Sequence, residues 1–327
     1  MQVIGPIART AEDAALLLAG MCGRDPARPL ARPDRPGDFL VLRPASLRGL
    51  RIAWTFDLGD LPVQAEVRAV LGAARARLEA AGCSVHDAAP DLSDADEVFG
   101  VLRAARMAGM APLLRAHRHQ IKQSVAWNIT KGIALSGEQI AAARLTQAAI
   151  FQRFASSLRD GRYEVLALPT MQVLPFDVQT EWVRQINTEP MATYIDWLRS
   201  CSRITVTAHP AVSVPAGLTP HDPAAPRLDP DAAGLPVGLQ LVGHYGGDRR
   251  LLEIAAAVMS LPGWAAAGVR AALPGPPSVS GLTPHANDAP DLAGRAGGVT
   301  ACPAFVAGAP AGHSASALRR LCASSLV

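Results

Sequence analysis

Short apolar runs alternate with helical stripes in the first part of the chain, and this alternation predicts an α/β fold. Residues 49–56 read as a strand, residues 64–81 carry apolar positions at helical spacing, and residues 83–88 read as a second short strand. Gly82 follows the helix at the position where a left-handed cap is expected. Strand, helix and strand in this order are typical of a sheet whose faces are covered by helices.

An earlier helix is predicted near the N-terminus, with Thr10 as its N-cap and Asp13 in its first turn. Its apolar positions recur at i, i+3, i+4 and i+7 and predict a buried face made of Ala14, Leu17, Leu18 and Met21. The stretch 24–39 contains four prolines and is therefore expected to be an extended connection.

The middle of the chain is predicted to be mostly helical. Residues 94–122 and 136–159 have helical periodicity, and the second segment opens with Ser136 and Gln139 in the spacing of a capping box. Such a cap satisfies two free backbone donors, so this helix has a well-defined start.

Strands return after these helices. Residues 163–168 form a predicted strand that ends at Pro169, and residues 211–217 and 234–243 are two further apolar segments. We expect the last two to pair as a hairpin with a long loop, and the helix 248–261 to pack on the sheet that they join.

The character of the chain changes near Gly263. Residues 264–327 are rich in Ala, Gly and Pro, contain neither lysine nor glutamate, and show no sustained periodicity. The sequence therefore predicts a folded domain over residues 1–263 and a disordered, low-complexity tail over residues 264–327.

Composition places the chain among globular proteins, with 49% hydrophobic and 18% charged residues. Its net charge of +3 comes from arginines scattered among acidic residues, which argues against direct nucleic-acid binding. No apolar run approaches the roughly 18 residues that a membrane-spanning helix needs. Since the N-terminus also lacks a basic region leading into an apolar one, we expect a cytoplasmic protein without membrane contact.

No metal or cofactor site is predicted. The five cysteines lie far apart and form no CxxC pair, so buried free thiols are expected. His117 and His119 have a spacing seen in some metal sites, but Arg115 and Arg118 would oppose a cation, which favours a charged helix face. For His209, just before a strand, a structural hydrogen bond is favoured over a catalytic role.

Candidates for amine-assisted nucleophilic chemistry are few, because the chain has only two lysines, Lys122 and Lys131. Lys122 and Ser124 are two residues apart and do not face each other on a helix. Lys131 and Ser136 are expected in a loop around Gly132, on the solvated surface. No catalytic residue is assigned from these patterns, and no GxSxG elbow is present.

Three segments, in order, resemble the amidase signature family. They are GPIARTAEDAALLLAGMCGRDP at 5–26, YEVLALPT at 163–170, and the pair TAHPAVSVPAG at 207–217 with GLPVGLQLVG at 234–243. The resemblance covers about residues 2–262. Gln2, Val3 and Ile4 look like the strand that leads into the first segment, so Met1 falls inside the resemblance.

The resemblance implies part of an α/β/α sandwich around a mixed sheet, without its N-terminal portion. It also implies hydrolysis of a carboxamide C–N bond by a serine, a second serine with a cis peptide bond and a lysine, without metal or cofactor. In the family these three residues precede the segment that resembles 5–26. We therefore expect a truncated chain that is inactive alone.

The same resemblance implies that the loop after the strand 163–168 lies near the entrance of the substrate pocket. Pro169, Thr170 and Met171 are therefore expected to contact a small amide substrate, if the missing segment completes the site. Trp127 and Trp182 are candidates for an apolar wall, although aromatic residues beside helices more often belong to the core. A partial sheet would also expose strand edges, which predicts self-association.

Two other functions are compatible with the sequence. The chain is alternatively the amidase-like subunit of a tRNA-dependent amidotransferase, which would require partner subunits. It is alternatively a non-catalytic binding or scaffold protein that keeps the pocket half of the fold.

Overall fold

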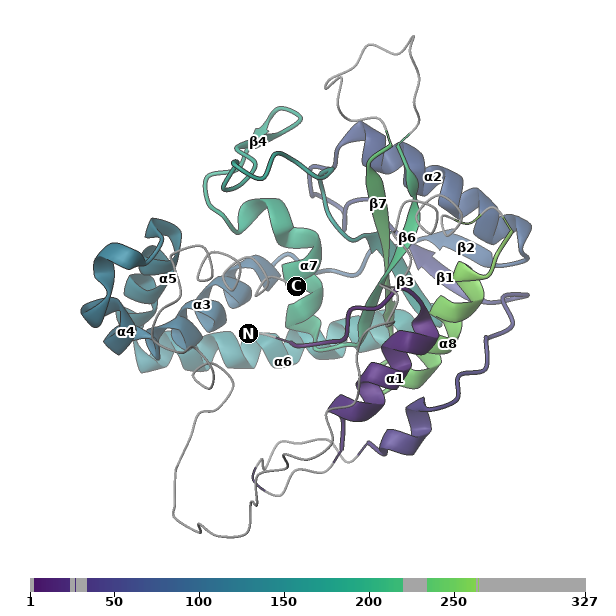
Figure 1. Cartoon of the computed structure of the whole chain (residues 1–327), viewed down its shortest axis with the longest axis horizontal. Helices are drawn as coiled ribbons and strands as arrows, with labels where there is room; N and C mark the ends of the chain where they lie inside the picture. The colour runs from purple at the N-terminus through teal and green to yellow at the C-terminus, as the bar shows by residue number, and fades with distance from the viewer. Residues whose placement is uncertain (1–2, 24–26, 28–33, 220–233, 263, 265–327) are drawn as a thin grey trace, which may run out of the picture. The chain divides into compact units, whose positions relative to one another are not determined.

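A mixed five-stranded sheet is the centre of the fold (Figure 1). The computed structural model describes residues 3–23, 27, 34–219, 234–262 and 264, all within the unit Met1–Ala272. The strand order is β2-β1-β3-β7-β6, with β2, β1 and β3 parallel and β7 antiparallel to both β3 and β6. The strands are Arg51–Trp54 (β1), Ser84–Asp87 (β2), Val165–Pro169 (β3), Ala211–Leu218 (β6) and Pro236–Gly243 (β7), and a separate two-residue pair joins Gln185–Ile186 (β4) to Glu189–Pro190 (β5).

Helices cover both faces of the sheet, so this part of the chain has three layers. The prediction of an α/β fold with a mixed sheet is therefore confirmed. No helix in the described residues is both long and apolar enough to cross a bilayer. The helices are Ala11–Met21 (α1), Ala65–Ala80 (α2), Ala95–Ala108 (α3), Ala111–Ala116 (α4), Gln123–Ile133 (α5), Gly137–Asp160 (α6), Arg199–Thr207 (α7) and Asp248–Met259 (α8), with 3-10 turns at Pro36–Phe39 (η1), Arg118–Gln120 (η2) and Asp196–Leu198 (η3).

Helices α2 and α8 form the layer on one face. The apolar stripe predicted for residues 64–81 is buried as expected and consists of Val67, Val70, Leu71 and Leu78. Gly82 ends this helix with a φ of +91°, which confirms the predicted left-handed cap. This core therefore follows the sequence periodicity closely.

Helices α3, α6 and α7 form the layer on the other face, where α6 packs Ile150, Phe154 and Leu158 into the core. The Ser136 hydroxyl accepts a hydrogen bond from the Gln139 amide, and the Gln139 side chain accepts one from the Ser136 amide. The predicted capping box is thus confirmed.

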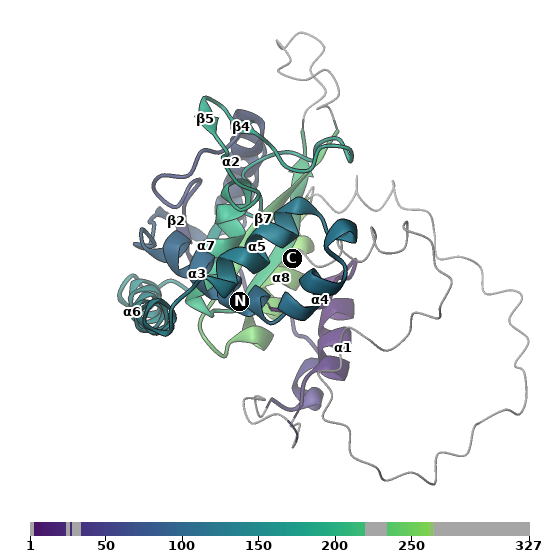
Figure 2. The same cartoon turned by 90° about the vertical axis from the view of Figure 1, so that its left-hand side faces the viewer.

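Helices α4 and α5 lie together beside α3, as Figure 2 shows. The contact between α3 and α5 is close because Gly132 lacks a side chain: a Cβ there would come within 1.9 Å of the Ala104 carbonyl oxygen. Lys131 is part of α5, so the expected loop around Gly132 was wrong. Cooperative extension of the helix outweighs a single glycine, which weakens a helix by only about 1 kcal/mol.

The buried face of α1 differs from the prediction. Thr10 caps the helix as expected, accepting a hydrogen bond from the Asp13 amide at 3.0 Å. Leu17 and Met21 of the predicted face are, however, 48% and 52% exposed. The helix instead contacts α8 and η1 through a row of small residues, Ala11, Ala15 and Ala19. Ala14 and Leu18 of the predicted face pack partly buried beside this row, whereas Leu17 and Met21 stay uncovered by the described residues.

Three smaller features also differ from the sequence expectations. Pro36–Phe39 is a 3-10 turn rather than extended chain, because Phe39 is buried against α1. Val3 and Ile4 are exposed and form no strand. Trp264, at the start of the predicted tail, is 2% exposed and packs in the core. The loop 220–233 and the rest of the predicted tail lie outside the described residues.

Candidate functional site at the carboxyl edge of the sheet

The predicted contact residues lie where β3 ends. Pro169 is the last residue of β3 and is buried, while Thr170 and Met171 are half-buried just beyond it. Because β1, β2 and β3 are parallel, the loops that follow them emerge at the same edge of the sheet. Binding sites of open α/β sheets commonly lie at this edge, which makes it the candidate site of this fold.

Two hydroxyl groups from different strands meet there. The Thr170 Oγ1 lies 2.7 Å from the Oγ of Ser213 on β6. Strand β7 runs between β3 and β6, and its residue at the crossing is Gly238, where a Cβ would approach the two hydroxyl oxygens to 2.8 and 2.9 Å. The glycine therefore allows this pair to form a polar spot on the sheet surface.

Helix α7 supports the same turn. The Ser200 Oγ donates to the Thr170 carbonyl at 2.9 Å, and the Cys201 Sγ lies 3.0 Å from the same oxygen. Burial raises the pKa of the Cys201 thiol to about 11. The thiol is therefore protonated near neutral pH and is a poor nucleophile, so its role here is to hold the turn.

Gln172 ties the loops after β1 and β3 together. Its side chain is fully buried, donates to the Pro62 carbonyl at 3.0 Å, and accepts from the Ser200 amide at 3.3 Å. A buried amide with partners on two other segments restricts the movement of all three. The turn that carries Thr170 is thus held from both sides.

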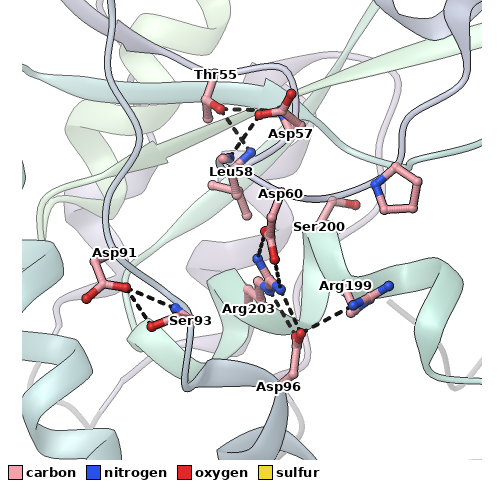
Figure 3. Close-up of polar contacts among 12 residues, drawn as sticks. Thr55, Asp57, Leu58, Asp60, Asp91, Ser93, Asp96, Arg199, Ser200 and Arg203 are labelled. Atoms are coloured by element: carbon pink, nitrogen blue, oxygen red, sulfur yellow. Dashed lines mark hydrogen bonds and ion pairs between the residues drawn. The ribbon is translucent and has the colours of Figure 1, made fainter. Parts of the chain in front are cut away.

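A buried arginine joins α7 to two other segments, as Figure 3 shows. Arg203 is 3% exposed and bonds to both Asp60, after β1, and Asp96, on α3. Arg199 approaches Asp96 at 3.6 Å. Burial lowers the pKa of Arg203, but hydrogen bonds and charge from the two carboxylates raise it above its usual value. Every charge in this cluster has an opposite partner, so the cluster is structural rather than reactive.

A shallow hollow of about 340 Å³ opens between the carboxyl ends of β1 and β2. Its lining comes from the ends of these strands and the following turns: Trp54, Thr55, Phe56, Asp57, Gly59, Asp87, Ala88 and Ala89. Pro169, Thr170 and Met171 lie at the neighbouring strand end, so their contact with substrate stays a prediction.

Neither lysine forms a nucleophile and base pair in the described part of the chain. Lys122 is the N-cap of α5, and Lys131 lies with its Nζ 5.3 Å from the centre of the Trp127 ring. Ser124 instead donates to Glu181 at 2.7 Å. These residues match the expectation of a solvated surface, and catalysis by a serine needs a base within hydrogen-bond reach.

The candidate metal residues are likewise on the surface. His117 and His119 are exposed, and no three His, Cys, Asp or Glu side chains gather around one point within the described ranges. Among the described cysteines, Cys22, Cys83 and Cys201 are free thiols; Cys83 is buried and the other two are partly buried.

An aromatic cluster follows the predicted contact residues and was not recognised in the sequence as a unit. Trp182 and Tyr194 meet at 6.4 Å between ring centres, Tyr194 and Trp197 at 6.0 Å, and Phe176 and Trp197 at 5.2 Å. Trp182 is half-buried here, whereas Trp127 is 44% exposed and is not core. The sequence feature that indicates this cluster is a local concentration of aromatic residues, since one of the three tyrosines and two of the five tryptophans lie between 182 and 197.

Comparison with known proteins assigns the family. The family model for amidases matches residues 1–252. The chain belongs to the amidase family. The segments that resembled the family in sequence form α1, β3, β6 and β7, and the last three place the Thr170 and Ser213 hydroxyls side by side.

Curated relatives of this chain include two kinds of enzyme. An acylamidase of Rhodococcus erythropolis is 27% identical over 267 residues, covering 80% of this chain and 52% of the relative. A glutamyl-tRNA(Gln) amidotransferase subunit of Deinococcus radiodurans is 29% identical over 282 residues, covering 78% and 54%. The chain therefore spans about half the length of the curated relatives that it matches.

Solved structures give the same coverage. A bacterial aryl acylamidase of the amidase signature family superposes with a TM-score of 0.66 at 25% identity, over 80% of this chain and 53% of that chain. A 6-aminohexanoate cyclic dimer hydrolase superposes with a TM-score of 0.62 at 21% identity, over 79% and 54%, and shows the shared fold.

Proposed function

We propose that this chain is one part of an amide-hydrolysing fold and that it does not hydrolyse amides by itself. The observation that supports this proposal is the absence of a lysine amine bonded to a serine hydroxyl in the described residues, in a family member that spans about half of its relatives. An amide carbonyl is resonance-stabilised, so its attack needs an activated nucleophile and oxyanion donors held in place.

In the proposed complete site, Pro169, Thr170 and Met171 contact the substrate. The support is their position at the carboxyl edge, where the Thr170 hydroxyl lies on the surface beside Ser213 while α7 holds its backbone. Contacts of this kind bind ground state and transition state alike, and such binding does not lower the barrier of the chemical step.

The test is an amide hydrolysis assay with and without a complementing polypeptide. The purified chain is mixed with the part of the Rhodococcus erythropolis acylamidase that it does not match, and hydrolysis of anilides and of aliphatic and aromatic amides is followed by release of amine or ammonia. We expect no turnover above background from either polypeptide alone and turnover from the mixture. Turnover by the chain alone that is lost in Lys122→Ala or Lys131→Ala would overturn the proposal.

A second candidate is the role of the amidase-like subunit in a glutamyl-tRNA(Gln) amidotransferase. It is favoured by relatives that carry this enzyme's name, at up to 29% identity, from Deinococcus, Ralstonia and other organisms. The same complementation, run with the matching polypeptide of Deinococcus radiodurans and with glutamine as the amide, separates the two. Glutamine hydrolysis without anilide hydrolysis would favour this second role, whereas ligand binding without any turnover in the mixtures would favour a scaffold.

A further inference from the structure

Positive charge is concentrated on one part of the described structure. Residues 98–137 contain six Lys and Arg but no Asp or Glu, whereas the rest of the chain has 25 Lys and Arg against 28 Asp and Glu. This stretch, called the basic lobe below, forms most of α3 together with α4, η2 and α5, which lie side by side (Figure 1, Figure 2). The whole chain has a net charge of only +3 because acidic residues elsewhere offset the lobe.

The charges of the basic lobe are largely exposed. Five of the six side chains are exposed, namely Arg106, Arg115, Arg118, Lys122 and Lys131. None of the six forms an ion pair within the described residues, whereas arginines elsewhere in the fold bond to carboxylates. Glu181 contacts the lobe by accepting from Ser124 at 2.7 Å, and it offsets one charge. The lobe therefore keeps a net positive charge that attracts anions over about 10 Å in about 0.1 M salt.

Large apolar side chains are exposed among these charges. Leu113, Trp127 and Ile133 are 44%, 44% and 55% exposed, although the lobe has an apolar core of its own. The Lys131 Nζ lies 5.3 Å from the centre of the Trp127 ring. Exposed tryptophan and aliphatic side chains among basic residues are typical of helices that lie at a membrane surface, where the indole ring occupies the headgroup region.

We propose that the basic lobe binds the surface of a membrane that contains anionic lipids. The lipid headgroups neutralise the exposed cations, while Leu113, Trp127 and Ile133 enter the boundary between headgroups and acyl chains. This binding is peripheral and needs no spanning helix. The sequence-based expectation of no membrane contact rested on the lack of a spanning segment and of a leader, and neither bears on a peripheral surface. The proposal does not rest on amide hydrolysis.

Charge and apolar exposure together favour a lipid surface over other anionic partners. A nucleic acid would pair its phosphates with the cations but would leave the aliphatic side chains of Leu113 and Ile133 in water. The chain's own residues 265–327 carry four arginines and two aspartates, so their charge does not complement the lobe. An anionic bilayer satisfies both the cations and the apolar side chains.

The test is flotation of the full chain with vesicles of phosphatidylcholine, with or without phosphatidylglycerol. We expect binding only to the vesicles with phosphatidylglycerol, and weaker binding as salt is raised. The double variant Arg115→Glu, Arg118→Glu should bind these vesicles about tenfold or more weakly, because it reverses two exposed charges. The double variant Arg43→Glu, Arg77→Glu is the matched control, since both residues are exposed outside the lobe and the net charge changes equally.

A second pair of variants tests the apolar contribution. Leu113→Ser should weaken vesicle binding several-fold, whereas Leu145→Ser, at an exposed leucine of α6, should bind like the parent chain. Equal flotation with both kinds of vesicle would overturn the proposal, as would parent-level binding by the Arg115→Glu, Arg118→Glu variant, an equal loss in its control, or no difference between the leucine variants. Binding of a labelled single-stranded RNA without any flotation would also overturn it and would identify a nucleic acid as the partner.

Discussion

At the scale of single residues, His209 shows how burial sets a protonation state. It is 7% exposed, with its ring centre 4.6 Å from that of Phe154 and 5.1 Å from that of Phe151. Its Nδ1 lies 2.8 Å from the Thr207 carbonyl oxygen, which confirms the structural hydrogen bond expected from the sequence. That oxygen only accepts, so Nδ1 carries the proton and the buried Nε2 is unprotonated.

This environment predicts a loss of stability in mild acid. Burial lowers the pKa of His209 below 6.5, although the bond to Thr207 opposes the shift. Above pH 6.5 the imidazole is neutral in both the folded and the unfolded chain, and its contribution to the free energy of unfolding is complete. As pH falls through 6.5 towards the lower folded pKa, the unfolded chain takes up a proton that the folded chain does not, so the free energy of unfolding decreases.

Urea denaturation between pH 8 and pH 5 measures this effect. His209→Asn keeps a donor near the Nδ1 position and removes the titration, so its stability should decrease less than that of the parent chain over this interval. His117→Asn, at an exposed position, is the control and should follow the parent chain. Parallel curves for all three proteins would contradict the prediction.

At the scale of elements, the contact between α3 and α5 depends on one missing side chain. The hypothetical Cβ of Gly132 lies 1.9 Å from the Ala104 carbonyl oxygen and 2.7 Å from its carbonyl carbon, and both are backbone atoms that cannot turn away. This close approach holds α5, and with it Ser124 and Trp127, beside α3.

Gly132→Ala should therefore destabilise the fold. Alanine normally stabilises a helix interior by about 1 kcal/mol relative to glycine, but here the overlap forces the helices apart, at about 1–3 kcal/mol net. Gly137→Ala in the first turn of α6 is the matched control, because no atom lies within 4 Å of its Cβ position, and it should be neutral or stabilising. Chemical denaturation compares the two, and equal stability of Gly132→Ala and the parent chain would refute the clash.

At the scale of the whole described unit, two surfaces have features that are usual in a protein interior: one is an open strand edge and the other exposes large apolar side chains. Strand β6 ends the sheet with β7 as its only partner among the described strands. The N-terminal segment and α1 also expose several large apolar side chains, namely Val3, Ile4, Ile7, Leu16, Leu17 and Met21. Exposed apolar patches and open strand edges favour association.

We expect the isolated chain to self-associate through these surfaces. Size-exclusion chromatography with light scattering should show oligomers, and the double variant Leu16→Lys, Leu17→Lys should shift them towards monomer. Leu145→Lys is the control, since Leu145 is 75% exposed but lies on α6, whereas α1 packs on η1 and α8. A monodisperse monomer of the parent chain with a cooperative melt would count against this expectation.

Local chemistry along the chain was enough to determine most of the long helices and strands of the sheet. Caps such as Thr10 and Ser136, the left-handed Gly82, and the alternation of strands with helical stripes each depend on residues a few positions apart. The family followed from three ordered segments. The position of Pro169, Thr170 and Met171 at a strand end was predictable for the same reason.

Tertiary structure alone decided which groups meet. The sequence pattern of α1 predicted a leucine face, yet its alanines are buried because of how closely α8 approaches. Thr170 and Ser213 are 43 residues apart and touch only because Gly238 lies between them. Arg103, on α3, resembles any other arginine in sequence, and only packing buries its Nε without an acceptor among the described residues. Contacts between distant residues are set by packing and burial, which short-range periodicity does not encode.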